Sequence, residues 1–85
     1  MAHVCSTCGW PHLHEPPRSA ASGGSYEICP SCGFQPGVTD DDEGYTPVEW
    51  RTAWIKKGMP WTSVGVRRPA AWNPGAQLQK LTGGN

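Results

Sequence analysis

Two Cys-x2-Cys pairs, separated by twenty residues, constrain the fold of this chain more than any other feature of its sequence. Cys5 and Cys8 form the first pair, and Cys29 and Cys32 form the second. Two residues between cysteines let both sulfurs face one ion from a tight turn, so this spacing is typical of a four-thiolate zinc site. We therefore predict that these residues hold one Zn²⁺ ion, with iron as the alternative metal because four thiolates also bind iron.

Two other uses of the cysteines stay open at this point, namely a pair of disulfides and a catalytic dithiol. A redox-active Cys-x2-Cys motif expects a strand followed by a helix, a context that neither pair has. Residues 1–10 lack the basic start and apolar run of a signal peptide, and no segment approaches the roughly 18 apolar residues of a membrane span. We expect a cytoplasmic protein without a membrane partner, whose reduced thiols favour metal binding.

Histidines near the first pair are alternative ligands, because mixed Cys and His zinc sites exist. We expect His3, His12 and His14 on the surface instead, since four cysteines already complete a tetrahedron. A complete tetrahedron leaves no position for the water that a catalytic zinc ion activates. The sequence also has no Gly-rich phosphate loop, no GxSxG and no His-Glu-x-x-His motif. We predict that the protein is not an enzyme.

The apolar content is too low for an ordinary core of this size. Leu, Ile, Val and Phe together account for eleven of the 85 residues, whereas Gly and Pro account for twenty. Small domains of this kind often depend on a metal for stability. We predict a small metal-stabilised α+β fold: a zinc ribbon with two Cys-x2-Cys turns and short β-strands, followed by one or two short helices. Residues 1–45 form the zinc-ribbon part, and residues 46–85 form a helical, Trp-rich, basic part of the same domain.

Local signals place the elements along the chain. Residues 15–24 are rich in helix and strand breakers and predict a loop, whereas residues 25–28 alternate polar and apolar types and predict a short strand. Thr46 begins a capping box, so we predict a helix over residues 47–57 that Gly58 ends. A second short helix is predicted over residues 74–81, with an Asn cap and Pro at its first position.

The apolar residues of these two helices predict which faces are buried. In the first helix, Trp50, Ala53 and Trp54 recur at spacings of three and four and should face the core. In the second helix, Leu78 and Leu81 should face inward. A helix this short is marginal alone, so it must dock to be stable.

The formal charge is zero, but the charges are divided along the chain. All seven acids lie in residues 1–49 with one base, Arg18, and the other six bases follow with no acid. The basic tail could fold back on the acidic half, or the separated charges could steer a partner. We predict that the partner-binding residues come from the acidic run and the Trp-rich half: Asp40, Asp41, Asp42, Glu43, Trp61, Arg67 and Arg68.

One segment resembles a known family. Residues 25–32 read Ser-Tyr-Glu-Ile-Cys-Pro-Ser-Cys, and they follow Glu-Pro-Pro at 15–17 and Cys-Gly-Trp at 8–10. These motifs, within residues 5–57, resemble the bacterial cysteine-rich CPCC family. Thr7 stands where that family has an additional cysteine, and the acidic run comes later than in the family. The resemblance implies a small metal-binding protein, with some relatives acting as immunity or partner proteins of bacterial toxins.

Three functions follow as hypotheses. The leading hypothesis is a structural zinc protein that acts as a protein–protein interaction module and possesses a toxin-neutralising, immunity-like role. The first alternative is a zinc ribbon that binds nucleic acid through its bases and tryptophans, although the zero net charge weakens this reading. The second alternative is a rubredoxin-like electron carrier with an iron ion.

Overall fold

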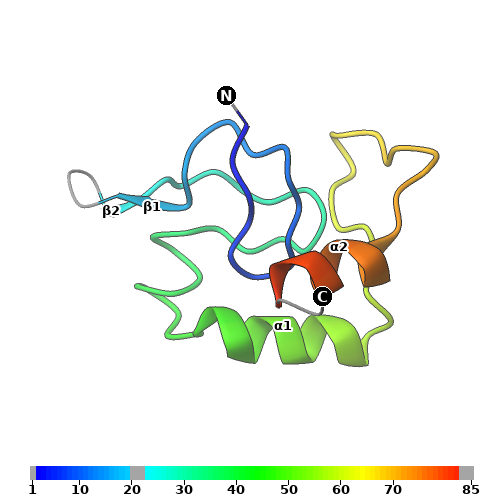
Figure 1. The fold of residues 1–85 in the computed structure, drawn as a ribbon. Helices are drawn as coiled ribbons and strands as arrows, with labels where there is room; N and C mark the ends of the chain where they lie inside the picture. The colour runs from blue at the N-terminus through cyan, green and yellow to red at the C-terminus, as the bar shows by residue number, and fades with distance from the viewer. Residues whose placement is uncertain (1, 20–22, 83–85) are drawn as a thin grey trace.

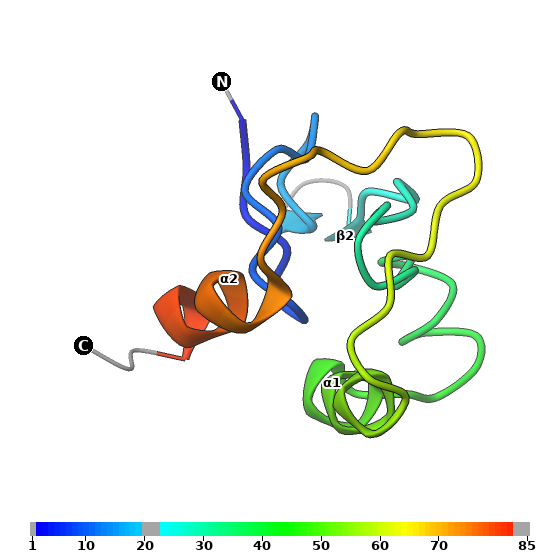
Figure 2. The ribbon, with the colours of Figure 1, turned by 90° about the vertical axis from the view of Figure 1, so that its right-hand side faces the viewer.

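A computed structural model describes residues 2–19 and 23–82 of the chain. Its elements are β1 (Arg18–Ser19), β2 (Gly23–Gly24), α1 (Pro47–Lys56) and α2 (Pro74–Leu81), and turns and loops form most of the remainder. The loops of the N-terminal half lie above α1 in both views, and a wide loop over residues 59–73 joins the two helices (Figures 1 and 2). The predicted small α+β fold with two short helices is present.

The strands do not lie where the sequence pattern placed them. β1 and β2 pair antiparallel, with Arg18 opposite Gly24 and Ser19 opposite Gly23. The predicted strand over residues 25–28 is wrong, and the predicted loop over residues 15–24 contains this hairpin, although residues 20–22 lie outside the described residues.

Tyr26 explains why residues 25–28 form no strand. Its φ of 63° is left-handed, a conformation that interrupts an extended chain. Its amide donates to the carbonyl of Pro36 instead of to a neighbouring strand, at 2.9 Å. The next residue, Glu27, turns its carboxylate toward the amides of His14 and Glu15, which donate to it at 2.9–3.1 Å. This segment therefore bonds to two loops, one on each side.

Helix α1 begins as its capping signal predicts. The Thr46 hydroxyl accepts a hydrogen bond from the amide of Glu49 at 3.1 Å, and the Glu49 carboxylate accepts one from the Thr46 amide at 2.9 Å. The helix ends one residue before the predicted boundary, because Lys57 is its C-cap. Gly58 follows with a left-handed φ of 95°, which confirms it as the stop signal.

Helix α2 spans the predicted residues and is capped by Asn73, whose side-chain oxygen accepts from the amide of Ala76 at 3.0 Å. Leu78 is half-buried and packs against the core, and Leu81 is also half-buried. The predicted inward face is thus confirmed, and it gives this short helix the docking that it needs.

The core of the described residues is built around sulfur and aromatic rings. Its buried apolar members are Cys5, Cys8, Trp10, Leu13, Cys29, Cys32, Phe34 and Trp54. From the predicted stripe of α1, Trp54 is buried and Trp50 packs at its edge, but Ala53 is exposed, so this part of the prediction is wrong. A single aliphatic residue, Leu13, belongs to this described core, which explains why so sparse a chain needs the cysteines at its centre.

Candidate metal centre

The two Cys-x2-Cys segments fold into matching turns, which we call the first cysteine turn (residues 5–10) and the second cysteine turn (residues 29–34). In the first turn, the Cys5 amide donates to the Trp10 carbonyl at 2.8 Å, and the Gly9 amide donates to the Cys5 carbonyl at 2.9 Å. The corresponding bonds of the second turn are 3.0 Å and 2.8 Å long. The sequence repeat is therefore also a structural repeat.

A glycine closes each turn because the backbone there is left-handed. Gly9 has a φ of 88° and Gly33 a φ of 83°. Space is limiting as well, since a Cβ on Gly9 would lie 2.5 Å from the backbone oxygen of Gln77 in α2. The glycine thus lets the first turn form and lets α2 pack directly on it.

We expect Gly9→Ala to destabilise the fold by about 2–4 kcal/mol, since it adds a steric overlap to the roughly 1–2 kcal/mol of left-handed strain. Gly58→Ala is the matched control, because its φ is also left-handed but no atom lies within 4 Å of the added Cβ. It should cost only the strain, about 1–2 kcal/mol. Urea unfolding followed by circular dichroism measures the free energy of unfolding of both variants. Equal decreases would show that α2 does not pack closely on the first cysteine turn.

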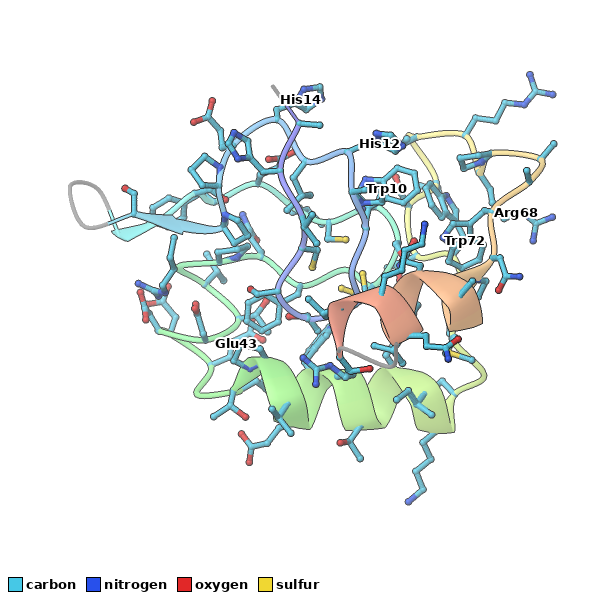
Figure 3. The ribbon with its side chains drawn as sticks, viewed as in Figure 1. Trp10, His12, His14, Glu43, Arg68 and Trp72 are labelled. Atoms are coloured by element: carbon cyan, nitrogen blue, oxygen red, sulfur yellow. The ribbon has the colours of Figure 1, made fainter. Side chains whose placement is uncertain are left out.

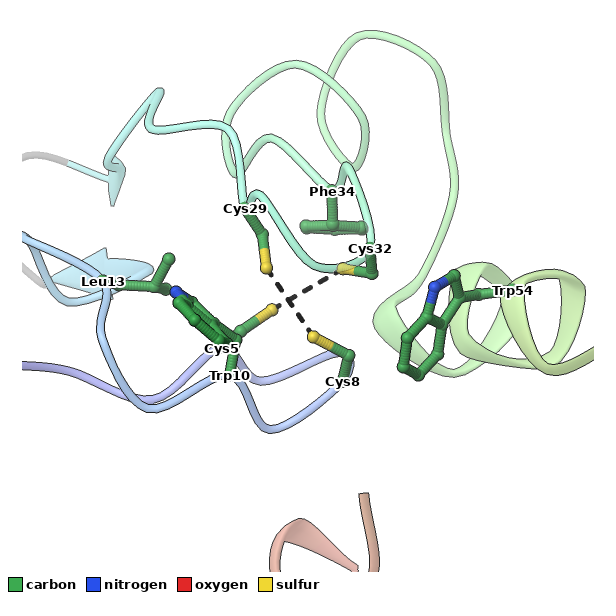
Figure 4. Packing of buried hydrophobic residues seen from close by; sticks show 8 residues of the cluster. All are labelled: Cys5, Cys8, Trp10, Leu13, Cys29, Cys32, Phe34 and Trp54. Atoms are coloured by element: carbon green, nitrogen blue, oxygen red, sulfur yellow. Dashed lines mark hydrogen bonds between the residues drawn. The ribbon is translucent and has the colours of Figure 1, made fainter. Parts of the chain in front are cut away.

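The two turns bring all four sulfurs together in the interior. The sulfur atoms lie within 4.8 Å of one another, and each cysteine is at most 3% exposed. Cys5 Sγ lies 3.8 Å from Cys32 Sγ, and Cys8 Sγ lies 3.6 Å from Cys29 Sγ. The two sulfur pairs cross like opposite edges of a tetrahedron (Figure 4).

These distances fit a metal ion. Four sulfurs placed about 2.3 Å from a tetrahedral ion would be about 3.8 Å apart. All four cysteines are free, and their separations greatly exceed the roughly 2.0 Å of a disulfide bond. The predicted ligands Cys5, Cys8, Cys29 and Cys32 therefore form a buried cluster that could hold a metal ion.

The electrostatics of the cluster also favour a cation. Hydrogen bonds with the thiols of Cys29 and Cys32 lower the pKa of Cys5 from its ordinary value. Hydrogen bonds with Cys29 and Cys5, together with burial, raise the pKa of Cys32. Four thiolates buried this close together would repel one another. A divalent cation removes this conflict, since coordinating thiols are deprotonated.

Helix α1 caps the outside of both cysteine turns. Arg51 donates to the carbonyl of Thr7 at 2.7 Å and to that of Ser6 at 3.0 Å, both in the first turn. The Trp50 indole donates to the carbonyl of Cys32 in the second turn at 2.9 Å. Because carbonyls of both turns accept hydrogen bonds from α1, the helix links the two turns.

Gln77 of α2 makes a second link between the turns. Its side-chain nitrogen donates to the carbonyl of Cys8 at 3.0 Å and to the hydroxyl of Ser31 at 3.1 Å, while its oxygen accepts from the Trp72 indole. The amide of Thr62 also donates to the Pro30 carbonyl at 3.1 Å. The C-terminal half therefore contacts both cysteine turns directly, a role that its sequence does not signal.

The histidines lie outside the sulfur cluster. His12 and His14 are exposed, and His3 forms an isolated antiparallel bridge with Leu13. Within residues 2–19 and 23–82, the four cysteines are the group with metal-binding geometry. The expected surface position holds for His12 and His14, whereas His3 is half-buried.

The predicted acidic run is partly structural. Asp40 and Asp41 accept hydrogen bonds from the Arg18 guanidinium, at 2.9 Å and 2.6 Å. Asp40 also accepts from the amide of Gly37 at 2.6 Å. Desolvation tends to raise the pKa of Asp40, but the bonds from Arg18 and the amides outweigh it and hold that pKa below its ordinary value. Asp42 and Glu43 are exposed.

The other predicted binding residues lie elsewhere. Trp61 is half-buried between Trp10 and Trp72, whereas Arg67 and Arg68 are exposed. Glu43 and Arg68 lie on opposite sides of the molecule (Figure 3). In the described parts of the chain, Arg18 supplies the ion pairs to the acidic run, so the basic tail does not fold back on it through salt bridges.

Comparison with protein-family models, curated proteins and solved structures finds no match for this chain. The resemblance to the CPCC family therefore stays a prediction. Neither described helix is long and apolar enough to cross a membrane.

Proposed function

We propose that this chain is a small protein with one structural zinc ion, and that it acts by binding another protein. The observation that carries the proposal is the buried cluster of four free cysteine sulfurs. Four thiolates complete a tetrahedral zinc site, and sites of this closed type stabilise folds. Two matching Cys-x2-Cys turns around one ion correspond to a zinc ribbon.

The closed centre argues against chemistry at the metal. A catalytic zinc ion needs an open position for water or substrate, and four cysteines at most 3% exposed leave none. Zinc is favoured over ferrous iron because divalent zinc binds a given ligand set more tightly. A rubredoxin-like electron carrier would require iron in the same cluster. Reduced thiols also suit the cytoplasm, where we place the protein.

The surface is better suited to a protein than to a nucleic acid. The formal charge of the chain is zero, whereas neutralisation of phosphates supplies most non-specific affinity for nucleic acids. Glu43 of the acidic run and Arg68 lie on opposite sides of the molecule (Figure 3), and such separated charges can orient a protein partner. A bacterial toxin is the class of partner that the CPCC resemblance implies.

Affinity capture from the source organism, with nuclease treatment and mass spectrometry, tests this function. We expect the zinc-loaded chain to retain one specific protein after nuclease treatment, and the chelated chain to lose it. Recovery of no specific protein at any ionic strength would contradict the proposal. Retention of RNA that nuclease abolishes would instead support the nucleic-acid alternative.

A further inference from the structure

A half-open groove of about 600 Å³ lies between the first cysteine turn and α2. Its walls come from segments far apart in the sequence, and they include Trp10, His12, Trp72, Ala76, Lys80 and Leu81. Pro11 and Pro69 extend the apolar lining. A cavity of this size accommodates a few side chains of a bound segment.

The walls of the groove are held in place before any ligand arrives. Trp61 packs edge-on against both Trp10 and Trp72, with ring centroids 5.1 Å apart in each pair. The Trp72 indole donates to Gln77, which in turn donates to the Cys8 carbonyl at 3.0 Å. The groove is thus tied to the metal centre, and a preorganised surface loses less entropy on binding.

The charge of the groove favours an anionic ligand. Lys80 lines it, and no acidic residue does. Lys80 forms no ion pair with any described residue. Arg68 lies on the same side of the molecule as Trp72, whereas Glu43 lies across from them (Figure 3). An acidic residue of a partner would therefore meet complementary charge here.

We propose that this groove binds an extended segment of a partner protein in which proline or another apolar residue lies beside Asp or Glu. Aromatic-lined grooves accept proline-containing segments because such segments are already extended and lose little entropy. The inference rests on the proposed function, since it names the face and the chemistry of the protein that is bound.

A nucleic acid fits the same groove less well. Stacking of bases requires aromatic faces that are open to solvent. Trp10 is only 7% exposed, Trp61 is packed between two other tryptophans, and the indole nitrogens of Trp61 and Trp72 already donate to the chain. The rings form walls and do not protrude as stacking platforms.

Selection from a displayed library of random peptides of about twelve residues, with the zinc-loaded protein as bait, tests the proposal. We expect convergence on sequences that place Asp or Glu beside Pro or another apolar residue. A labelled synthetic copy of the selected peptide should bind at micromolar affinity, and replacing its acid with Lys should weaken it about tenfold.

Two matched variants locate the binding. Ala76→Glu adds bulk and negative charge inside the groove, and Ala53→Glu makes the same change at an exposed position of α1. We expect the first to weaken peptide binding at least about tenfold and the second to leave it unchanged. Both should keep the zinc content and circular dichroism of the parent, because both alanines are exposed.

Three results with peptides would overturn the proposal: no converging peptide, selected peptides without an acid, or peptide binding that survives Ala76→Glu. A labelled oligouridylate that binds the parent but not Ala76→Glu would assign the groove to nucleic acid and likewise overturn it. A different result would contradict the proposed function. If a captured protein still binds the Ala76→Glu variant, only the assignment of the groove as the binding site is overturned. If no protein is captured at all, the proposed function is overturned.

Discussion

Replacing Cys29 with Ser is expected to remove the metal and most of the native structure together. The hydroxyl of serine is a poor zinc ligand, and the loss of one thiolate opens a site that is otherwise buried. Binding of structural zinc contributes about 10–16 kcal/mol in small zinc-dependent peptides. Whole domains are stable by only about 5–15 kcal/mol. If the cluster holds zinc as proposed, the metal would therefore account for most of the stability that this chain can have.

Circular dichroism and zinc analysis of purified Cys29→Ser measure both consequences. Ser6→Ala is the matched control, because Ser6 lies in a cysteine turn, is exposed, and contacts Arg51 through its backbone oxygen. It should keep one zinc per chain and the parent spectrum. A native spectrum for Cys29→Ser, or for the parent after strong chelation, would show that the fold does not depend on the metal.

Truncating Trp54 to Ala is expected to cost about 3–5 kcal/mol, the range for large aromatic residues in cores. Trp54 is 3% exposed and packs against the cysteine cluster from α1 (Figure 4). Its indole nitrogen also donates to the Pro60 carbonyl at 2.9 Å. Without this ring, α1 loses its one buried side chain in the core. It keeps the hydrogen bonds from Trp50 and Arg51 to the cysteine turns.

Ile55→Ala provides the comparison for this effect. Ile55 follows Trp54 in the same helix but is 44% exposed, so its truncation should cost no more than about 1 kcal/mol. Urea unfolding of the zinc-loaded variants, followed by far-ultraviolet circular dichroism, gives the decrease in the free energy of unfolding for each variant. Similar losses for Trp54→Ala and Ile55→Ala would contradict the position of α1 against the core.

The features that the sequence predicts well depend on short stretches of chain. The spacing of the cysteines predicts the four-sulfur cluster, because each pair needs only one tight turn to present both of its sulfurs. The start of α1 follows from Thr46 and Glu49, which contact each other across a single helical turn. Helix α2 likewise follows from its Asn cap and its first-turn proline.

The strand prediction failed because distant partners decide that segment. Residues 25–28 have strand-like composition, but Tyr26 bonds to Pro36 and Glu27 bonds to residues 14 and 15. Such contacts leave no periodic trace in the sequence. The hairpin of β1 and β2 was not predicted for a different reason. β2 consists of two glycines, and glycine is disfavoured in strands.

The side-chain contacts that hold the two cysteine turns together were also beyond prediction. Arg51 reaches a carbonyl 44 residues away in sequence, and Gln77 reaches one 69 residues away. Polar side chains on short helices are usually solvent-exposed, so their composition gave no reason to place them on the cysteine turns. The groove could not be predicted for the same reason. Its walls are far apart in the sequence and meet only when α2 packs on the first cysteine turn.

X-ray absorption at the metal edge tests the central claim most directly, because it identifies the element and its nearest atoms. Protein purified without added metal should be colourless, contain one zinc ion per chain, and show four sulfur neighbours at about 2.3 Å. A red protein with iron in the cluster would contradict the zinc assignment. Nitrogen or oxygen among the nearest atoms would contradict the four-cysteine centre itself.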